Sequence, residues 1–499
     1  MSSVSFFASK PRSSQLGADF QIDGTDSHPA TLCRGGPSTP SHCRRTRGHR
    51  RSRSVNTGTS RIWDTVYFLV LGFVLIASVG LSVASLVYGD NKVLIQSDGK
   101  DYYIWARSIL LDRDIDFRND YQVMYAPDST PPDAAVRTPA GYVVNKFPMG
   151  MAILEMPGLM LGHFVARYVT HSPTDGVSLP YQVAVAWSLL GLYFASFILF
   201  YQAMLRLGVA RVWAFGFCLT ALLGTNLIHY VAKEMTMVHA AGVAVFNILL
   251  FLIVRWVGAD ERIRVVHGLL LGGLLGLLFL VRNTSVLLVP VLAAVVWARS
   301  RIRFSELMPV LAGAVLIASV QAVSLWFLWG RLRFSGYVSE SFTSGVSGIV
   351  STLMSARHGL LAYHPWYAIL LLLSAYGVVR MPRVRLVCAA ALASFLLMAI
   401  ANGTWWCWWF GHSFGNRAFI ETLPSLSIAA ALVVSNLNLG RCAAVVLATL
   451  VVVVVLVNLN LWVGYLLQAY SPDGGHTIAQ AYLWLLSRSP ASLIRHLAQ

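Results

Sequence analysis

The chain has 499 residues, of which 56% are hydrophobic and only 12% are charged, about half the charged fraction of an ordinary globular protein. Apolar runs of about 18 or more residues recur along it, and a helix needs about 20 residues to cross the hydrocarbon core of a bilayer. This composition excludes a set of soluble domains and predicts an all-α, polytopic membrane protein. The formal net charge of +16 then gives information about topology, because Lys and Arg favour the cytoplasmic side.

The first predicted segment, residues 1–61, is a polar tail rich in Ser, Gly, Pro and Arg. It has too few hydrophobic residues to fold and contains, at positions 44–53, the basic run RRTRGHRRSR. Such a run could bind nucleic acid, but next to an apolar span it is better explained as a cytoplasmic topology signal that touches anionic lipid. We therefore expect a disordered cytoplasmic tail and no nucleic-acid partner.

About eleven apolar runs follow, and we predict that each is a transmembrane helix. The runs are 62–88, 182–205, 212–229, 238–254, 265–281, 284–298, 308–329, 360–379, 386–401, 419–436 and 443–466. With the tail inside, alternate connections should be basic. Five of them are, with Arg206/Arg211, Arg255/Arg262/Arg264, Arg299/Arg301/Arg303, Arg380/Arg383/Arg385 and Arg441. The transmembrane domain therefore covers 62–466, and residues 467–499 form a short extracytoplasmic tail.

This charge pattern also assigns residues 148–167 to the outside, because every later connection would invert if they crossed the membrane. The apolar stretch that contains them is interrupted by Pro148 and Pro157, so we predict a juxtamembrane helix along the outer interface. The first outer loop then runs over 89–181 and is by far the longest. No internal repeat is evident, which disfavours a transporter built from inverted halves.

The first outer loop holds eleven of the 22 acidic residues of the chain. Asp98 and Asp101 are three positions apart, so a helix or turn there would place both carboxylates on one face. Low-dielectric surroundings raise the pKa of a carboxylate and suit it to general-base catalysis. The alternative is that Asp98 only caps a helix that begins at Gly99.

Further along the loop, Asp112, Asp114 and Asp116 form a DxDxD motif, which suggests the metal–nucleotide motif of soluble glycosyltransferases. Nucleotide sugars are cytoplasmic, however, whereas this loop is predicted outside. In an extended strand the three side chains would share one solvated face. We therefore favour a surface role over a metal role for these residues.

Lys146 precedes Phe147-Pro148, whose restricted backbone predicts an extended arm. A lysine at the membrane surface could bind a lipid phosphate. It could equally extend its ammonium group to the interface, as any interfacial lysine can. Both interpretations remain open.

Ionisable residues also recur at the outer ends of later spans, where charge is costly and often functional. They are Lys233, Glu234, His239, Arg282, Arg357, His358, Arg417 and Glu421. Any one alone is more often an ion-paired anchor. The stretch Thr404–Trp409 adds four tryptophans in five consecutive positions, which suit both an interfacial belt and stacking on sugar rings. Gly411 and His412 follow almost at once.

These features, in this order, resemble the GT-C superfamily of integral-membrane glycosyltransferases, and within it the polyprenyl-phosphate-sugar-dependent mannosyltransferase and aminoarabinose transferase group. The resemblance covers roughly residues 62–440. The matching pieces are SDGKDYY from Ser97, LLDRDIDF from Leu110, NKFPMG from Asn145, Tyr230 to His239, LVRN from Leu280, RHGL from Arg357, and Trp409 to Arg417. The chain departs from the group where Gly99 and Lys100 separate the two acids, and where Phe147-Pro148 replaces a double proline.

The resemblance implies transfer of a sugar from a polyprenyl-phosphate carrier to a glycan, lipid or protein acceptor at the extracytoplasmic face of the plasma (inner) membrane. It implies Asp98, and second Asp101, as the catalytic carboxylates, and Lys146 with Arg282, Arg357 or Arg417 at the donor phosphate. Supporting roles would fall to Glu234, His239, Trp409 and His412. Whether a divalent cation takes part remains open. The alternatives are a transporter or flippase of lipid-linked glycans, and a non-catalytic membrane protein of this fold.

Overall fold

The computed structural model describes residues 57–89, 92–125, 136–257, 263–299, 303–333, 335–338, 340–470 and 475–486. Most of the predicted tail 1–61 and the end of the predicted tail 467–499 lie outside the described residues. All described residues belong to one compact unit, Val55–Gln499. Within them the regular structure is helical, and β-structure is limited to two isolated bridges, Arg137↔Val143 and Phe342↔Trp405. The predicted all-α fold is confirmed.

Seven regions of the described chain are long and apolar enough to cross a membrane, and each coincides with a predicted span. They are α1 (Thr57–Tyr88), α5 (Leu179–Arg206), α8 (Val238–Trp256), α11 (Phe304–Trp329), α15 (Arg385–Thr404), η5 with α16 (Arg417–Thr422 and Leu423–Asn436), and α17 (Arg441–Leu466). Shorter apolar helices occupy the other four spans: α6 (Arg211–Leu223), α9 (Val265–Val281), η4 with α10 (Asn283–Leu288 and Val289–Arg299), and α14 (Trp366–Arg380). The protein is an integral membrane protein.

One predicted span, 212–229, ends earlier than expected. Helix α6 stops at Leu223, and after Gly224 the chain turns into the short helix α7 (Leu227–Ala232). The hydroxyl of Thr225 donates to the carbonyl of Ala221 at 2.7 Å and accepts from the backbone N–H of Leu227. Glycine is a poor helix former, and a threonine that bonds the backbone on both sides supports a turn.

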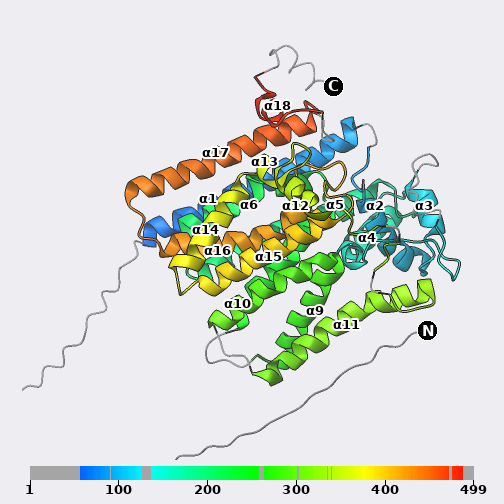
Figure 1. Cartoon of the computed structure of the whole chain (residues 1–499). Coiled ribbons are helices and arrows are strands. Elements are labelled where there is room, and N and C mark those ends of the chain that lie inside the picture. The colour runs from blue at the N-terminus through cyan, green and yellow to red at the C-terminus, as the bar shows by residue number, and fades with distance from the viewer. Residues whose placement is uncertain are drawn as a thin grey trace, which may run out of the picture. The chain divides into compact units, whose positions relative to one another are not determined.

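The outer helices of the bundle keep apolar side chains exposed, as contact with lipid requires. Helix α17 lies along one side of the bundle, and the packed pair α9 and α11 lies on the opposite side (Figure 1). Exposed residues on these helices include Val315, Leu316, Val445 and Leu456. Exposing such apolar surfaces to water would cost free energy, so they suit contact with the hydrocarbon of a bilayer.

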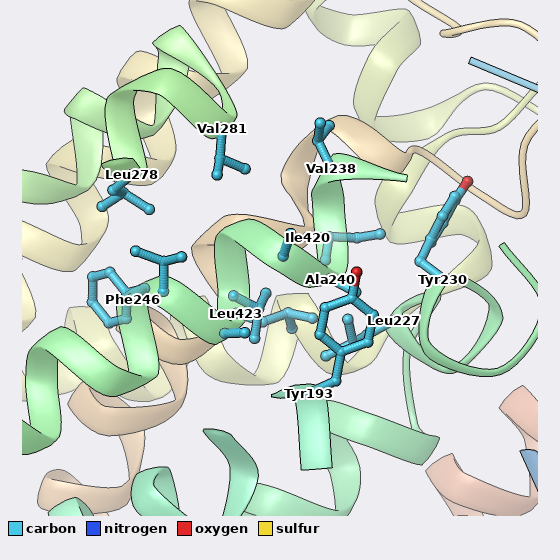
Figure 2. Packing of buried hydrophobic residues seen from close by; sticks show 14 of the residues in the cluster. Tyr193, Leu227, Tyr230, Val238, Ala240, Phe246, Leu278, Val281, Ile420 and Leu423 are labelled. Carbon is cyan, nitrogen blue, oxygen red and sulfur yellow. The ribbon is translucent and has the colours of Figure 1, made fainter. Parts of the chain in front are cut away.

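One hydrophobic core joins several helices of the bundle. Figure 2 shows its packing, with side chains from α5, α7, α8, α9, η5 and α16, and the labelled residues are Tyr193, Leu227, Tyr230, Val238, Ala240, Phe246, Leu278, Val281, Ile420 and Leu423. Tyr193 also donates a hydrogen bond to the carbonyl of Met235 at 2.6 Å. This hydrogen bond fixes the connection between α7 and α8, and the candidate site contacts that connection.

The long first loop folds into helices that lie together at one end of the bundle (Figure 1). They are α2 (Gly99–Arg107), the π-helix η1 (Ser108–Asp112), α3 (Arg118–Met124) and α4 (Gly150–Tyr168). Helix α4 is the predicted juxtamembrane helix and does not qualify as a candidate span. It packs closely on α5, because a Cβ at Gly158 would lie 2.7 Å from Cα of Val185. Its predicted course along the interface stays a prediction.

The prediction of an extended strand at the DxDxD motif is wrong. Asp112 ends the π-helix, and Arg113 has a left-handed backbone with φ of 62°. The buried Arg107 draws Asp112 inward, at 2.5 Å, together with Asp120 at 2.6 Å. Asp114 accepts hydrogen bonds from Ser108 and from the backbone of the residue two positions on. Local charge pairing, rather than alternation, decides this conformation, and it gives two of the three motif acids a role in holding the loop.

Candidate active site

Helix α2 carries the two acids that the sequence singles out. Asp98 stands at the N-cap position, but its side chain makes no capping hydrogen bond. Its Oδ2 instead accepts from Nη2 of Arg417 at 2.8 Å, across 319 residues of chain. Asp101 lies one turn further on and is 7% exposed. The interpretation of Asp98 as a helix cap is therefore wrong, and both acids act within a tertiary cluster.

The connection between α7 and α8 sets the position of α2. A Cβ at Gly99 would lie 2.1 Å from Oγ1 of Thr236, so only glycine allows this approach. Ser97 donates to Oε1 of Glu234 at 3.3 Å. Burial alone would raise the pKa of Glu234, but its interaction with His229, whose Nε2 lies 3.7 Å from Oε2, lowers the pKa overall. Glu234, predicted as a supporting residue, thus bonds to the residue that precedes Asp98.

Asp101 has the most perturbed carboxylate of α2. Burial, and second the negative charge of Asp98, raise its pKa from 3.8 to about 7. The hydroxyl of Tyr125 donates to Oδ1 of Asp101 at 3.1 Å, and this hydrogen bond opposes the rise, as does the charge of Lys146. The carboxyl group of Asp101 therefore holds a proton in part of the molecules near neutral pH.

The predicted lysine arm runs beside α2. Nδ2 of Asn145 donates to the backbone carbonyl of Asp101 at 2.8 Å, and Nε1 of Trp105 donates to the carbonyl of Phe147 at 3.0 Å. These bonds hold the extended segment that Pro148 requires. They place Lys146 close enough to Asp101 for its charge to act on that carboxylate. Nζ of Lys146 itself forms an ion pair with Oε1 of Glu340 at 2.6 Å.

Arg417 reaches Asp98 because of the loop that precedes η5. Gly415 has φ of +64°, and a Cβ there would lie 2.1 Å from Nε2 of His364, so a side chain has no room. Asn416 caps η5 by accepting from the N–H of Ala418 at 3.2 Å, and its Nδ2 donates to Oγ1 of Thr352 at 2.7 Å. This bracing directs the guanidinium of Arg417 toward α2.

Arg282 and His239 form a second polar group around Glu421, which is fully buried. Nη1 of Arg282 lies 3.0 Å from Oε2 of Glu421, and Nδ1 of His239 lies 3.0 Å from Oε1. Arg282 also donates to the carbonyl of Ala418 at 3.0 Å, next to Arg417. Arg282 therefore stabilises η5 first, and its role toward a donor phosphate stays a prediction.

Arg357 and Trp409 stack on each other, with the guanidinium carbon 4.0 Å from the ring centroid. Trp409 also contacts the rings of Trp406 and Trp408 edge-on, at 6.2 and 5.6 Å between centroids. His412 is exposed in the following loop. The structure thus brings predicted phosphate and sugar contacts together at this surface, but their roles stay predictions.

Sequence reasoning missed three members of the cluster: Tyr125, Tyr337 and Glu340. Glu340 lies in the connection that follows α11, and acidic residues are sparse enough outside the first loop for the sequence to have indicated it. Burial, together with the charge of Glu340, raises the pKa of Tyr337 to about 12. Neither tyrosine carries a signal in the sequence, because their partners come from distant segments.

A resident divalent cation does not fit the residues present. In the described part of the chain, no three His, Cys, Asp or Glu side chains gather as metal ligands. Asp98 is held by Arg417, and Asp101 is held by Tyr125. Divalent cations of the hard type need several oxygen ligands at short range. We therefore derive no chemical step through a metal.

The site combines paired carboxylates with cations at one end of a helical membrane bundle. No family model matches the chain, and no curated protein matches it. One similar solved structure is the crystal structure of ArnT from Cupriavidus metallidurans bound to undecaprenyl phosphate. The match covers 85% of this chain and 74% of that chain at 13% identity, with a TM-score of 0.43. At this level of similarity, we base the functional proposal on the site alone.

Proposed function

We propose that the protein is a membrane glycosyltransferase that moves a sugar from a polyprenyl-phosphate carrier to an acceptor hydroxyl at the extracytoplasmic face. The observation that carries this proposal is the grouping of Asp98, Asp101, Arg417 and Lys146 around one short helix. It combines a proton acceptor with cations for an anionic leaving group at the edge of a bilayer. Few reactions other than transfer from a lipid phosphate need both at that place.

The proposed step is a single displacement. The carboxylate of Asp98 accepts the proton of the acceptor hydroxyl while the acceptor oxygen bonds to the anomeric carbon. The bond from that carbon to the phosphate oxygen breaks, and its electron pair leaves with the polyprenyl phosphate. Lys146 stabilises the charge that develops there, because a pre-placed cation needs no reorganisation at the moment of reaction. Arg417 orients Asp98 through its hydrogen bond to Oδ2.

The basic ends of the helices support the proposed orientation. Arg206, Arg255, Arg299, Arg380 and Arg441 lie at the ends of α5, α8, α10, α14 and α17 that the predicted topology places opposite the α2 site. Basic residues mark the cytoplasmic side. The site would therefore face away from the cytoplasm, and its donor would be a lipid-linked sugar rather than a nucleotide sugar.

The first experiment identifies the donor as the lipid-linked sugar that accumulates in cells lacking the protein. Purified protein with this lipid and a cell-envelope acceptor fraction should then release polyprenyl phosphate, measured by mass spectrometry. Asp98→Asn should reduce release at least about 100-fold, the usual contribution of a general base. Asp116→Asn, in the same loop, is the matched control.

Unchanged release by Asp98→Asn at wild-type expression would remove the base and the proposed mechanism. Movement of the labelled lipid across vesicles without release of polyprenyl phosphate would indicate a flippase instead. If neither activity is found, the chain is a non-catalytic member of this fold class.

A further inference from the structure

The partner of Lys146 is a feature that the proposed reaction leaves unexplained. Nζ of Lys146 lies 2.6 Å from Oε1 of Glu340, and the two side chains are 26% and 16% exposed. Glu340 comes from the connection between α11 and α12 (Gly345–Met354), 194 residues further along the chain. The lysine assigned to a lipid phosphate thus already holds an anion, at an ion pair that solvent still reaches.

The segment that carries Glu340 lies directly on the lysine arm. We call residues 335–338 and 340 the strap. A Cβ at Gly336 would lie 2.7 Å from the carbonyl oxygen of Asn145 and 2.8 Å from Cα of Lys146. The ring centroid of Tyr337 is 5.9 Å from Nζ of Lys146, and its ring meets that of Phe147 edge-on. Any anion that binds Lys146 therefore meets Glu340 at the same ammonium group.

Glu340 has a second hydrogen-bond donor of its own. Nε1 of Trp406 donates to its Oε2 at 3.0 Å. The residues after the strap pair with the first two residues of the tryptophan cluster, through the Phe342↔Trp405 bridge and the N–H of Trp406, which donates to the carbonyl of Ser341 at 3.1 Å. The carboxylate therefore keeps a fixed donor when Lys146 turns to another anion. Replacing Glu340 by another anion at Lys146 therefore costs less free energy than it would if Lys146 were the sole donor to Glu340.

We infer that Glu340 competes with the lipid phosphate for Lys146 and thereby weakens the hold of the site on the phosphate product. This inference rests on the proposed function. A lysine ammonium has three donors, so both anions can contact it, but they repel each other. The donor is a phosphodiester with one negative charge, whereas the product is a phosphomonoester that carries about −1.5 to −2 at neutral pH. Repulsion from Glu340 therefore grows when the sugar–phosphate bond breaks, and Lys146 returns to Glu340 as the product leaves.

Binding of undecaprenyl phosphate to the purified full chain in detergent tests this inference. Glu340→Gln removes the charge but keeps an oxygen that can accept from Trp406. We expect its Kd for undecaprenyl phosphate to fall roughly tenfold, which corresponds to about 1.4 kcal/mol. In turnover, the same variant should show stronger inhibition by undecaprenyl phosphate and a lower kcat with a lower KM. Asp116→Asn removes one acid from the first outer loop and should bind as the wild type does.

Two further variants separate the failure of this inference from the failure of the proposed function. Equal affinity of Glu340→Gln and wild type, with weaker binding by Lys146→Met, would overturn the competition and leave the phosphate role of the lysine intact. Wild-type affinity of Lys146→Met would overturn both. Polyprenol, which has the tail without the phosphate, should bind all variants alike, and a tenfold gain for polyprenol in Glu340→Gln would also overturn the inference. Should Glu340→Gln unfold, Glu340→Ala carries the same expectation.

Discussion

Asp101→Asn tests whether the buried acid of α2 holds a proton. The pKa of Asp101 is raised from 3.8 to about 7, first by burial and second by the charge of Asp98. A carboxyl whose folded pKa exceeds its unfolded pKa stabilises the fold fully below the unfolded value, and this stability is lost as pH rises through the folded value. Wild-type protein should therefore lose stability between about pH 4 and pH 7. Asparagine stays neutral and should not.

The size of this effect follows from the two pKa values. A shift of about three pKa units corresponds to about 4 kcal/mol, because one unit is worth about 1.4 kcal/mol. Between pH 5 and pH 7 the stability gap between Asp101→Asn and wild type should grow by about 2 kcal/mol in favour of the variant. Above pH 7 the gap should level off, since Asp101 is then ionised in both the folded and the unfolded states.

Apparent unfolding temperatures in detergent, taken at half-unit steps from pH 5 to pH 8, measure this gap. Asp116→Asn, which removes an acid that is partly exposed, shows what the loss of a surface carboxylate does in the same loop. A gap that stays constant over the whole range would show that Asp101 is ionised throughout in the folded protein as well as in the unfolded protein. A variant that is less stable than the wild type at pH 8 would show that the ionised carboxylate is needed for the fold. Either result would refute the assignment.

Two further predictions concern the partners of these acids. Tyr125→Phe removes a hydrogen bond that lowers the pKa of Asp101, so the pH-dependent loss of stability should extend to higher pH in the same unfolding assay; an unchanged or lower midpoint contradicts this. Glu421→Gln leaves the largely buried charge of Arg282 without its carboxylate partner. The free energy of unfolding should therefore fall by about 3 kcal/mol, which is measured as a fall of several degrees in unfolding temperature. Wild-type stability of Glu421→Gln would mean that Arg282 finds another anion or water.

The sequence predicts the membrane framework well because lipid imposes a strong and local rule. Every backbone polar group in hydrocarbon needs an internal partner, so apolar runs become helices. This rule locates the spans, and the break of α6 at Gly224 is one exception. The two-acid face of α2 is predictable for a similar reason, because helical spacing is local and Gly99 marks the start of the helix.

Pairing between distant segments could not be predicted. Asp98 and Arg417 are 319 residues apart, and nothing near either of them names the other. Spacing also gave the wrong conformation for Asp112 to Asp116, because the buried Arg107 decides which acids turn inward. Glu340 could have been noticed as a rare acid, but its pairing with Lys146 depends on how the strap crosses the arm. Such pairings are tertiary contacts, which form only when the chain is folded.

The charges of the site balance in pairs, and this balance assigns the two aspartates different roles. Arg417 meets Asp98, Lys146 meets Glu340, and Asp101 alone faces a tyrosine hydroxyl. A bound phosphodiester adds a negative charge, and a like charge nearby raises the pKa of a carboxyl. Asp101 would then be protonated at neutral pH and could donate a hydrogen bond, whereas Asp98 already accepts one from Arg417. A carboxyl group that is kept neutral in this way can act as a hydrogen-bond donor. The catalytic base is therefore Asp98 in the proposed reaction, and Asp101 serves the acceptor or the phosphate in its neutral form.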